Sequence, residues 1–127
     1  MASIEHFAVF AADLGRTKDF YVESLGLRVL LDNSKAPVAG FFLGDDHGVA
    51  LEVIQRPPDR PALDTRYVCH AAFRVDDYDA AKQALQARHV EFEAETEVDN
   101  ESMKTGFFLD PDGNRCQIVW REKPLGS

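Results

Sequence analysis

The first half of the chain combines apolar runs of strand period with one segment of helical period. Apolar residues at alternate positions predict a strand over 4–10. Residues 14–25 carry apolar side chains at helical spacing, with Asp13 placed to cap the helix start and Gly26 suited to its left-handed end. Three further strands, each bounded by turn-forming residues, are predicted over 27–31, 38–43 and 49–54. This order defines a βαβββ unit.

The second half repeats the same order of elements. The predicted elements are a strand over 67–75, a helix over 80–88 capped by Asp76 or Asp77, and strands over 90–98, 103–109 and 115–120. In 90–98 apolar residues alternate with glutamates, which predicts one buried and one solvent-exposed face. Residues 110–114, Asp-Pro-Asp-Gly-Asn, predict a turn because proline fixes φ and glycine or asparagine accepts positive φ.

Proline-rich sequence between the two halves cannot continue a sheet ladder, which predicts a linker there. We therefore expect one domain over residues 1–127, with module one at 3–55, a linker at 56–65 and module two at 66–121. The predicted fold class is α+β, in which two tandem βαβββ modules form a curled mixed sheet around a cleft.

Particular residues recur between the two halves. The sequence Gly-Phe-Phe-Leu at 40–43 returns at 106–109. The polar strand positions that recur with it are His6 with His70 and Glu52 with Gln117. Internal repetition of this kind indicates a duplicated module. The repeat therefore points to four candidate site residues, two in each half.

The charge balance narrows the range of partners. A net charge of −8 argues against nucleic acid and against anionic membrane surfaces, since both require clustered basic residues. No run approaches the ~20 apolar residues that span a bilayer, and no secretory signal is visible. Cys69 and Cys116 lie within apolar strand patterns, which predicts buried free thiols. We therefore expect a cytoplasmic protein that binds neither nucleic acid nor a membrane surface.

The motifs together resemble the vicinal oxygen chelate superfamily, and the resemblance covers essentially the whole chain. This superfamily includes glyoxalase I, extradiol dioxygenases, fosfomycin-resistance transferases and bleomycin-resistance proteins. The residues that carry the resemblance are His6, Asp13, Phe20-Tyr21, Leu25-Gly26-Leu27, Glu52, His70 and Asp110-Pro111-Asp112-Gly113-Asn114 before Gln117.

By this resemblance, the metal ligands fall at His6, Glu52, His70 and Gln117. Two imidazoles and one carboxylate suit Fe²⁺, Mn²⁺, Ni²⁺ or Zn²⁺ with open positions for substrate oxygens. Similar enzymes carry a carboxylate at this position, whereas this chain has Gln117. An amide is a weaker oxygen donor than a carboxylate and cannot act as a base. We therefore expect weakened coordination, with Glu52 as the candidate catalytic base as well as a ligand.

The resemblance implies an enzyme: a divalent-metal-dependent lyase, isomerase or dioxygenase that polarises vicinal oxygens of a small substrate. The alternative is a metal-free binding protein of bleomycin-resistance type that sequesters a planar or aromatic ligand. Arg74 and Arg115 are candidate contacts to an anionic group, and Phe42 and Phe108 are candidate stacking residues. Small members of the superfamily usually dimerise, so the resemblance also implies a homodimer.

Overall fold

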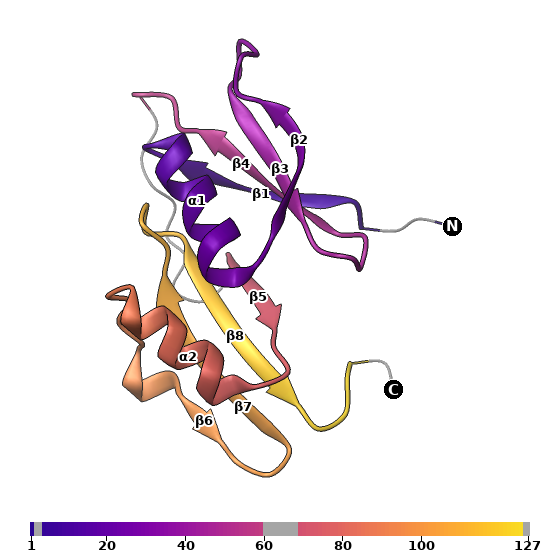
Figure 1. Ribbon diagram of the computed structural model, residues 1–127, viewed down its shortest axis with the longest axis vertical. Helices are drawn as coiled ribbons and strands as arrows, with labels where there is room; N and C mark the ends of the chain where they lie inside the picture. Colours follow the sequence, from indigo (N-terminus) through magenta and orange to yellow (C-terminus); the bar gives the residue numbers. More distant parts are fainter. Residues whose placement is uncertain (2–3, 60–68, 126–127) are drawn as a thin grey trace. The chain divides into compact units, whose positions relative to one another are not determined.

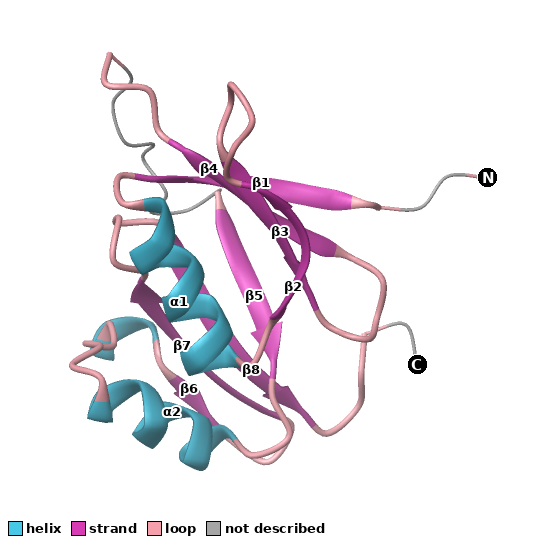
Figure 2. Ribbon diagram, turned by 45° about the horizontal axis from the view of Figure 1, so that its top comes forward, coloured by secondary structure: helices cyan, strands magenta, loops and turns pink. Residues whose placement is uncertain are grey.

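The computed structural model describes residues 1, 4–59 and 69–125. The chain divides into two compact units, Met1–Ala62 and Leu63–Ser127. Each unit holds a four-stranded mixed sheet with an α-helix packed on one face (Figure 1; Figure 2). This architecture confirms the predicted pair of βαβββ modules. In the part of the chain that the structure describes, no helix has the length and apolar character needed to cross a bilayer.

The first unit follows the predicted order closely. Its elements are β1 (His6–Ala11), α1 (Leu14–Leu25), β2 (Arg28–Asn33), β3 (Gly40–Gly44) and β4 (Ala50–Gln55). The strand order is β1-β4-β3-β2, with β1 parallel to β4 and the other pairs antiparallel. The helix bounds match the prediction, and the strand ends differ from it by one or two residues.

Local capping chemistry sets the ends of α1, as predicted. The Asp13 carboxylate accepts a hydrogen bond from the Arg16 amide at 3.1 Å, which satisfies one free donor of the first turn. Gly26 ends the helix with φ at +74°, and its amide donates to the Val22 carbonyl. Between these ends, the helix buries one face against the sheet. The side chains in this core with no exposed surface include Thr17, Tyr21, Leu43 and Val53.

The second unit repeats this plan with one added turn of 3₁₀ helix. Its elements are β5 (His70–Arg74), α2 (Tyr78–Ala87), η1 (Ala94–Thr96), β6 (Val98–Asp99), β7 (Met103–Leu109) and β8 (Arg115–Arg121). The strand order is β5-β8-β7-β6, with β5 parallel to β8. Asp77 caps α2 by accepting from the Ala80 amide at 3.0 Å. The predicted start of β5 near Tyr67 lies outside the described residues.

The predicted continuous strand over 90–98 is interrupted. Phe92 forms an isolated antiparallel bridge with Phe108, and the Glu93 amide donates to the Phe107 carbonyl, but a 3₁₀ turn follows. Within this segment, which the structure describes in full, β6 covers Val98–Asp99 and η1 precedes it. The Glu93 carboxylate lies 2.7 Å from Arg115, and the Thr96 hydroxyl donates to the Glu93 carbonyl at 2.9 Å. These bonds to Glu93 favour a tight turn over a ladder. Alternation of apolar and acidic residues does not reveal them.

The two cysteines have different environments. Cys116 on β8 is fully buried, as predicted, but Cys69 is exposed just before β5. Neither of these two described cysteines forms a disulfide. The prediction that Cys69 is buried is therefore wrong. Cys69 lies just before His70, the first residue of β5, so it is not part of the strand whose alternate side chains are buried.

The Gly-Phe-Phe-Leu repeat is one residue out of register with the fold. Phe42 lies opposite Glu52 on the neighbouring strand, whereas Phe107 lies opposite Gln117. Successive strand side chains point to opposite faces, so a shift of one residue moves a side chain to the other face. Phe108 is accordingly fully buried in the core on the helix side. The structural counterpart of Phe42 is Phe107, which corrects the equivalence drawn from the repeat.

The first residue of α2, Tyr78, buries a hydroxyl group in this core. Its side chain is 6 % exposed, and its hydroxyl has no hydrogen-bond partner among the described residues. Gly106 leaves the space for it, since a Cβ there would lie 2.5 Å from the phenolic oxygen. Burial, together with the carboxylates of Glu97, Asp99 and Asp79, raises the pKa of Tyr78 to about 12.

This raised pKa predicts an alkaline loss of stability. An unfolded tyrosine loses its proton near pH 10, so the stability contribution is complete below about pH 10 and is lost as the pH rises toward 12. Tyr78→Phe is expected to remove this loss. At pH 7 the Tyr78→Phe variant should have an unchanged free energy of unfolding, or one higher by up to about 1 kcal/mol. The reason is that no hydrogen bond within the described residues is lost with the hydroxyl. Urea unfolding at pH 7 and pH 11 measures both effects; an equal alkaline loss in the two proteins contradicts the prediction.

Candidate functional site

In the first unit, three predicted site residues share the sheet face opposite α1. Phe42 on β3 and Glu52 on β4 are cross-strand partners, so their side chains project on the same side. His6 on β1 lies on this side too, and its ring meets Phe42 edge-on with the centroids 5.1 Å apart. The other face of the sheet is occupied by the core. The structure therefore brings His6, Phe42 and Glu52 together.

The hydrogen bonding of His6 determines which ring nitrogen is available. Its Nδ1 lies 2.8 Å from the Glu5 carboxylate. An ionised carboxylate only accepts, so Nδ1 carries a proton, and in a neutral ring Nε2 keeps its lone pair. Nε2 lies 3.6 Å from Oε1 of Glu52, too far for a hydrogen bond. The His6 and Glu52 side chains are 35 % and 25 % exposed, so solvent reaches both side chains.

This arrangement fits one side of a metal site. Ligand atoms about 2.1 Å from a shared ion lie roughly 3.0 to 3.4 Å apart, which is close to the separation of His6 Nε2 and Glu52 Oε1. Histidines that bind metals usually donate their other N–H group to a carboxylate or carbonyl, as His6 does to Glu5. Across residues 1, 4–59 and 69–125, no three His, Cys, Asp or Glu side chains form a metal-binding group.

The second unit carries an equivalent arrangement. His70 on β5 meets Phe107 edge-on with the ring centroids 5.3 Å apart. Gln117 on β8 lies directly opposite Phe107 on β7 and beside Ala72 on β5. A histidine, a phenylalanine and a polar β-strand residue thus recur on the same sheet face in both units. The sequence analysis chose Phe108 as the stacking residue of this half, whereas the pairing of Gln117 across the β7–β8 hairpin places Phe107 beside it.

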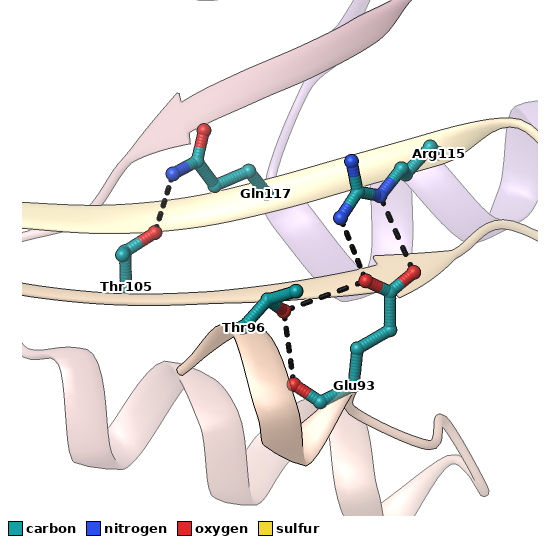
Figure 3. Close-up of polar contacts among 5 residues, drawn as sticks. All are labelled: Glu93, Thr96, Thr105, Arg115 and Gln117. Atoms are coloured by element: carbon teal, nitrogen blue, oxygen red, sulfur yellow. Dashed lines mark hydrogen bonds and ion pairs between the residues drawn. The ribbon is translucent and has the colours of Figure 1, made fainter. Parts of the chain in front are cut away.

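The Gln117 side chain is hydrogen-bonded to Thr105 on the neighbouring strand β7. Its Nε2 donates to the Thr105 hydroxyl at 2.5 Å (Figure 3). That hydroxyl lies 2.9 Å from the Ile118 carbonyl. Thr105 is 3 % exposed, whereas Gln117 is half-buried. One end of the Gln117 amide is therefore fixed inside the unit.

Arg115 and Arg74 have different roles in the fold. The Arg115 guanidinium makes two hydrogen bonds to the Glu93 carboxylate, at 2.7 and 3.3 Å (Figure 3). It also lies 3.9 Å from the centroid of the Phe107 ring. Its side chain is 9 % exposed. Arg115 therefore links η1 to the aromatic ring that contacts His70. Arg74, at the end of β5, is exposed on the same strand face as His70.

The turn over 110–114 sets the start of β8. Asp110 is buried, and its carboxylate accepts from the amides of Asp112 and Asn114 at 2.8 and 2.9 Å. Gly113 has φ at +84°, a conformation that favours glycine. These bonds confirm the predicted turn chemistry. Their effect is to fix the hairpin from which Arg115 and Gln117 project.

The fold and these motifs match a known family. A family model of the Glyoxalase/Bleomycin resistance protein/Dioxygenase superfamily matches residues 3–118, and the chain belongs to this superfamily. It is 33 % identical over 122 residues to the uncharacterized protein YaeR of Escherichia coli (strain K12). That match covers 89 % of this chain and 92 % of YaeR.

Solved structures with this fold include a binding protein and an enzyme. The antibiotic binding protein TnmS3 from Streptomyces sp. CB03234 is similar with a TM-score of 0.76 and 24 % identity, over 96 % of this chain and 98 % of TnmS3. The trypanothione-dependent glyoxalase I of Leishmania major has a TM-score of 0.75 and 23 % identity, over 94 % of this chain and 86 % of that chain. Both likenesses concern the fold.

Proposed function

We propose that this protein is a divalent-metal-dependent lyase, isomerase or dioxygenase that acts on a small substrate with vicinal oxygens. The observation that carries the proposal is the geometry of His6, whose Nδ1 is bound by Glu5 and whose Nε2 faces Glu52 at 3.6 Å. We assign His70 and Gln117 as the remaining ligands, because they occupy the equivalent positions of the second unit.

A bound Fe²⁺, Mn²⁺, Ni²⁺ or Zn²⁺ ion would supply Lewis-acid polarisation of the substrate oxygens. Glu52 is the one carboxylate among the four proposed ligands, so we assign it the second task of accepting a proton from the substrate at a carboxylate oxygen. The Gln117 amide cannot accept a proton in this way. Arg74, exposed on the face of His70, is the proposed contact to an anionic substrate group. Arg115 is not proposed for this role because Glu93 holds its guanidinium.

Metal uptake is the first test of this function. Protein depleted with a chelator is titrated separately with Fe²⁺, Mn²⁺, Ni²⁺ and Zn²⁺ by calorimetry, and one ion per chain is expected to bind. Isomerisation of a hemithioacetal by the metal-loaded protein then tests the isomerase or lyase activity. Ring cleavage of a catechol tests the dioxygenase activity. Protein that takes up none of the four proposed metals contradicts the proposal.

A metal-free binding protein is the second candidate. Phe42 and Phe107 are partly exposed beside the two histidines and present aromatic edges to a planar ligand. The likeness to an antibiotic binding protein favours this candidate as well. Trp120, half-buried on β8, provides a reporter. If planar polycyclic ligands change its fluorescence in metal-depleted protein, and added Ni²⁺ or Zn²⁺ has no effect, sequestration replaces catalysis as the function.

An exposed apolar segment supports the homodimer that we also propose. Val29, Leu30 and Leu31 on the edge strand β2 are 45 to 52 % exposed. Consecutive exposed apolar residues on a sheet edge are typical of an interaction surface. Light scattering at micromolar concentration is expected to give the mass of two chains, and the mass of one chain contradicts the dimer.

A further inference from the structure

We propose that Thr105 is a positioning residue that holds the Gln117 amide with its carbonyl oxygen outward, so that this position offers a neutral oxygen ligand. The ligand part of this inference rests on the proposed metal-dependent function. The orientation of the amide follows from hydrogen bonds within the second unit alone.

The Thr105 hydroxyl has its proton committed to the main chain. Its Oγ1 lies 2.9 Å from the carbonyl oxygen of Ile118. A carbonyl oxygen only accepts, and a hydroxyl has a single proton to donate. Thr105 is 3 % exposed, so water does not compete freely for this proton. Any second partner of Oγ1 must therefore be a donor.

Gln117 is that second partner, which determines the orientation of its amide. The end of the amide that lies 2.5 Å from Oγ1 must be the NH₂ group, since the carbonyl end would place two acceptors in contact. The opposite end, Oε1, consequently points away from Thr105, as Figure 3 shows. The end of the Gln117 amide that points away from Thr105 is therefore its oxygen, which is the atom that can coordinate a cation.

The same bonds explain why a glutamine occupies this position. A carboxylate at 117 would place an acceptor against an Oγ1 that has no proton to give. The Thr105 proton would have to leave the Ile118 carbonyl, and a buried main-chain acceptor would lose that bond. Thr105 thus selects a neutral amide over a carboxylate at 117.

The orientation is tested by NMR on the metal-free protein. The side-chain amide protons of Gln117 are identified by their absence from the ¹H–¹⁵N spectrum of Gln117→Ala. We expect one of them to be shifted away from the other, to exchange slowly and to show an Overhauser effect to Thr105. Thr105→Val, which keeps the volume, should collapse this shift, and Thr105→Ser should retain it. Unchanged Gln117 resonances in Thr105→Val overturn the inference. If Thr105→Val does not fold, absence of the Overhauser effect in the wild type overturns it.

The ligand role has a separate readout. Thr105→Val is expected to weaken Ni²⁺ or Zn²⁺ binding about 10- to 100-fold, the usual effect of removing a group that orients a ligand. Thr105→Ser should bind as the wild type does. Thr17→Val, which changes a fully buried threonine of α1, is the matched control and should leave metal affinity unchanged.

The outcomes separate the two proposals. If the wild type binds metal and Thr105→Val binds it equally tightly, the positioning role is wrong while the proposed function stands. If the wild type binds no metal, the proposed function and the ligand role both fail, and the NMR result alone decides the amide orientation.

Discussion

Replacing Glu52 by alanine is expected to lower the affinity for Ni²⁺ or Zn²⁺ by more than about 100-fold, since removing a direct ligand exceeds the effect of removing an outer group. Glu52 Oε1 lies 3.6 Å from Nε2 of His6, and the side chain is 25 % exposed, so its loss leaves the fold largely intact. Calorimetric titration of the metal-depleted variant measures the change.

A graded series makes this result specific. Glu5→Ala removes the carboxylate bound to His6 Nδ1 and should weaken metal binding about 10- to 100-fold. Glu101→Ala changes an exposed carboxylate in the turn before β7 and should have no effect. Equal metal affinities for the Glu52 and Glu101 variants would show that Glu52 is not a ligand.

Replacing Arg115 by alanine is expected to lower the free energy of unfolding by about 2 to 3 kcal/mol. Truncation removes the guanidinium that makes two hydrogen bonds to the Glu93 carboxylate. It also removes the cation that lies over the Phe107 ring. Breaking a fully buried ion pair costs roughly 3 to 5 kcal/mol. The expected loss is smaller here because Glu93 is 30 % exposed and can regain water. Urea unfolding measures the loss.

Arg74→Ala provides the matched control for Arg115. Arg74 lies on β5 with its side chain exposed, so its truncation should change the free energy of unfolding by less than about 0.5 kcal/mol. Arg115→Lys should fall between the two, because an ammonium cannot bind both Glu93 oxygens in a planar fork. If Arg115→Ala unfolds at the same urea concentration as Arg74→Ala, the ion pair with Glu93 contributes nothing to the fold.

The order of elements could be predicted from the sequence because it depends on local chemistry. Alternation along the strands and the caps of α1 at Asp13 and Gly26 involve residues a few positions apart. The duplication also identified His6 and Glu52 as equivalent in position to His70 and Gln117. The parallel pairing of β1 with β4 then places His6 and Glu52 on one sheet face.

What could not be predicted depends on partners that are distant in the sequence. The segment 90–98 has the alternation of a strand, but a 3₁₀ turn begins after Glu93, whose carboxylate pairs with Arg115 more than twenty residues later. The same contact makes Arg115 part of the fold, although its position on a polar strand face suggested an anion contact. A pattern of residue types contains no information about which charged pair forms.

Register was the second feature beyond the reach of sequence patterns. Identical letters in the two halves suggested that Phe42 and Phe108 are equivalent. Cross-strand pairing makes Phe107 the counterpart of Phe42 instead, and Phe108 is buried in the core. An exact repeat of four letters is therefore weaker evidence than the positions of the polar residues beside it. Thr105 escaped notice for a related reason, since its importance depends on hydrogen-bond direction.

The most direct test of the proposed metal site is proton NMR of the protein loaded with Co²⁺, a paramagnetic ion that binds imidazole nitrogen. We expect two exchangeable N–H resonances outside the diamagnetic range, one from His6 and one from His70. His6→Ala should remove one of them and His70→Ala the other. Spectra without such resonances at saturating Co²⁺, or with resonances that survive both substitutions, would contradict a metal site built on these histidines.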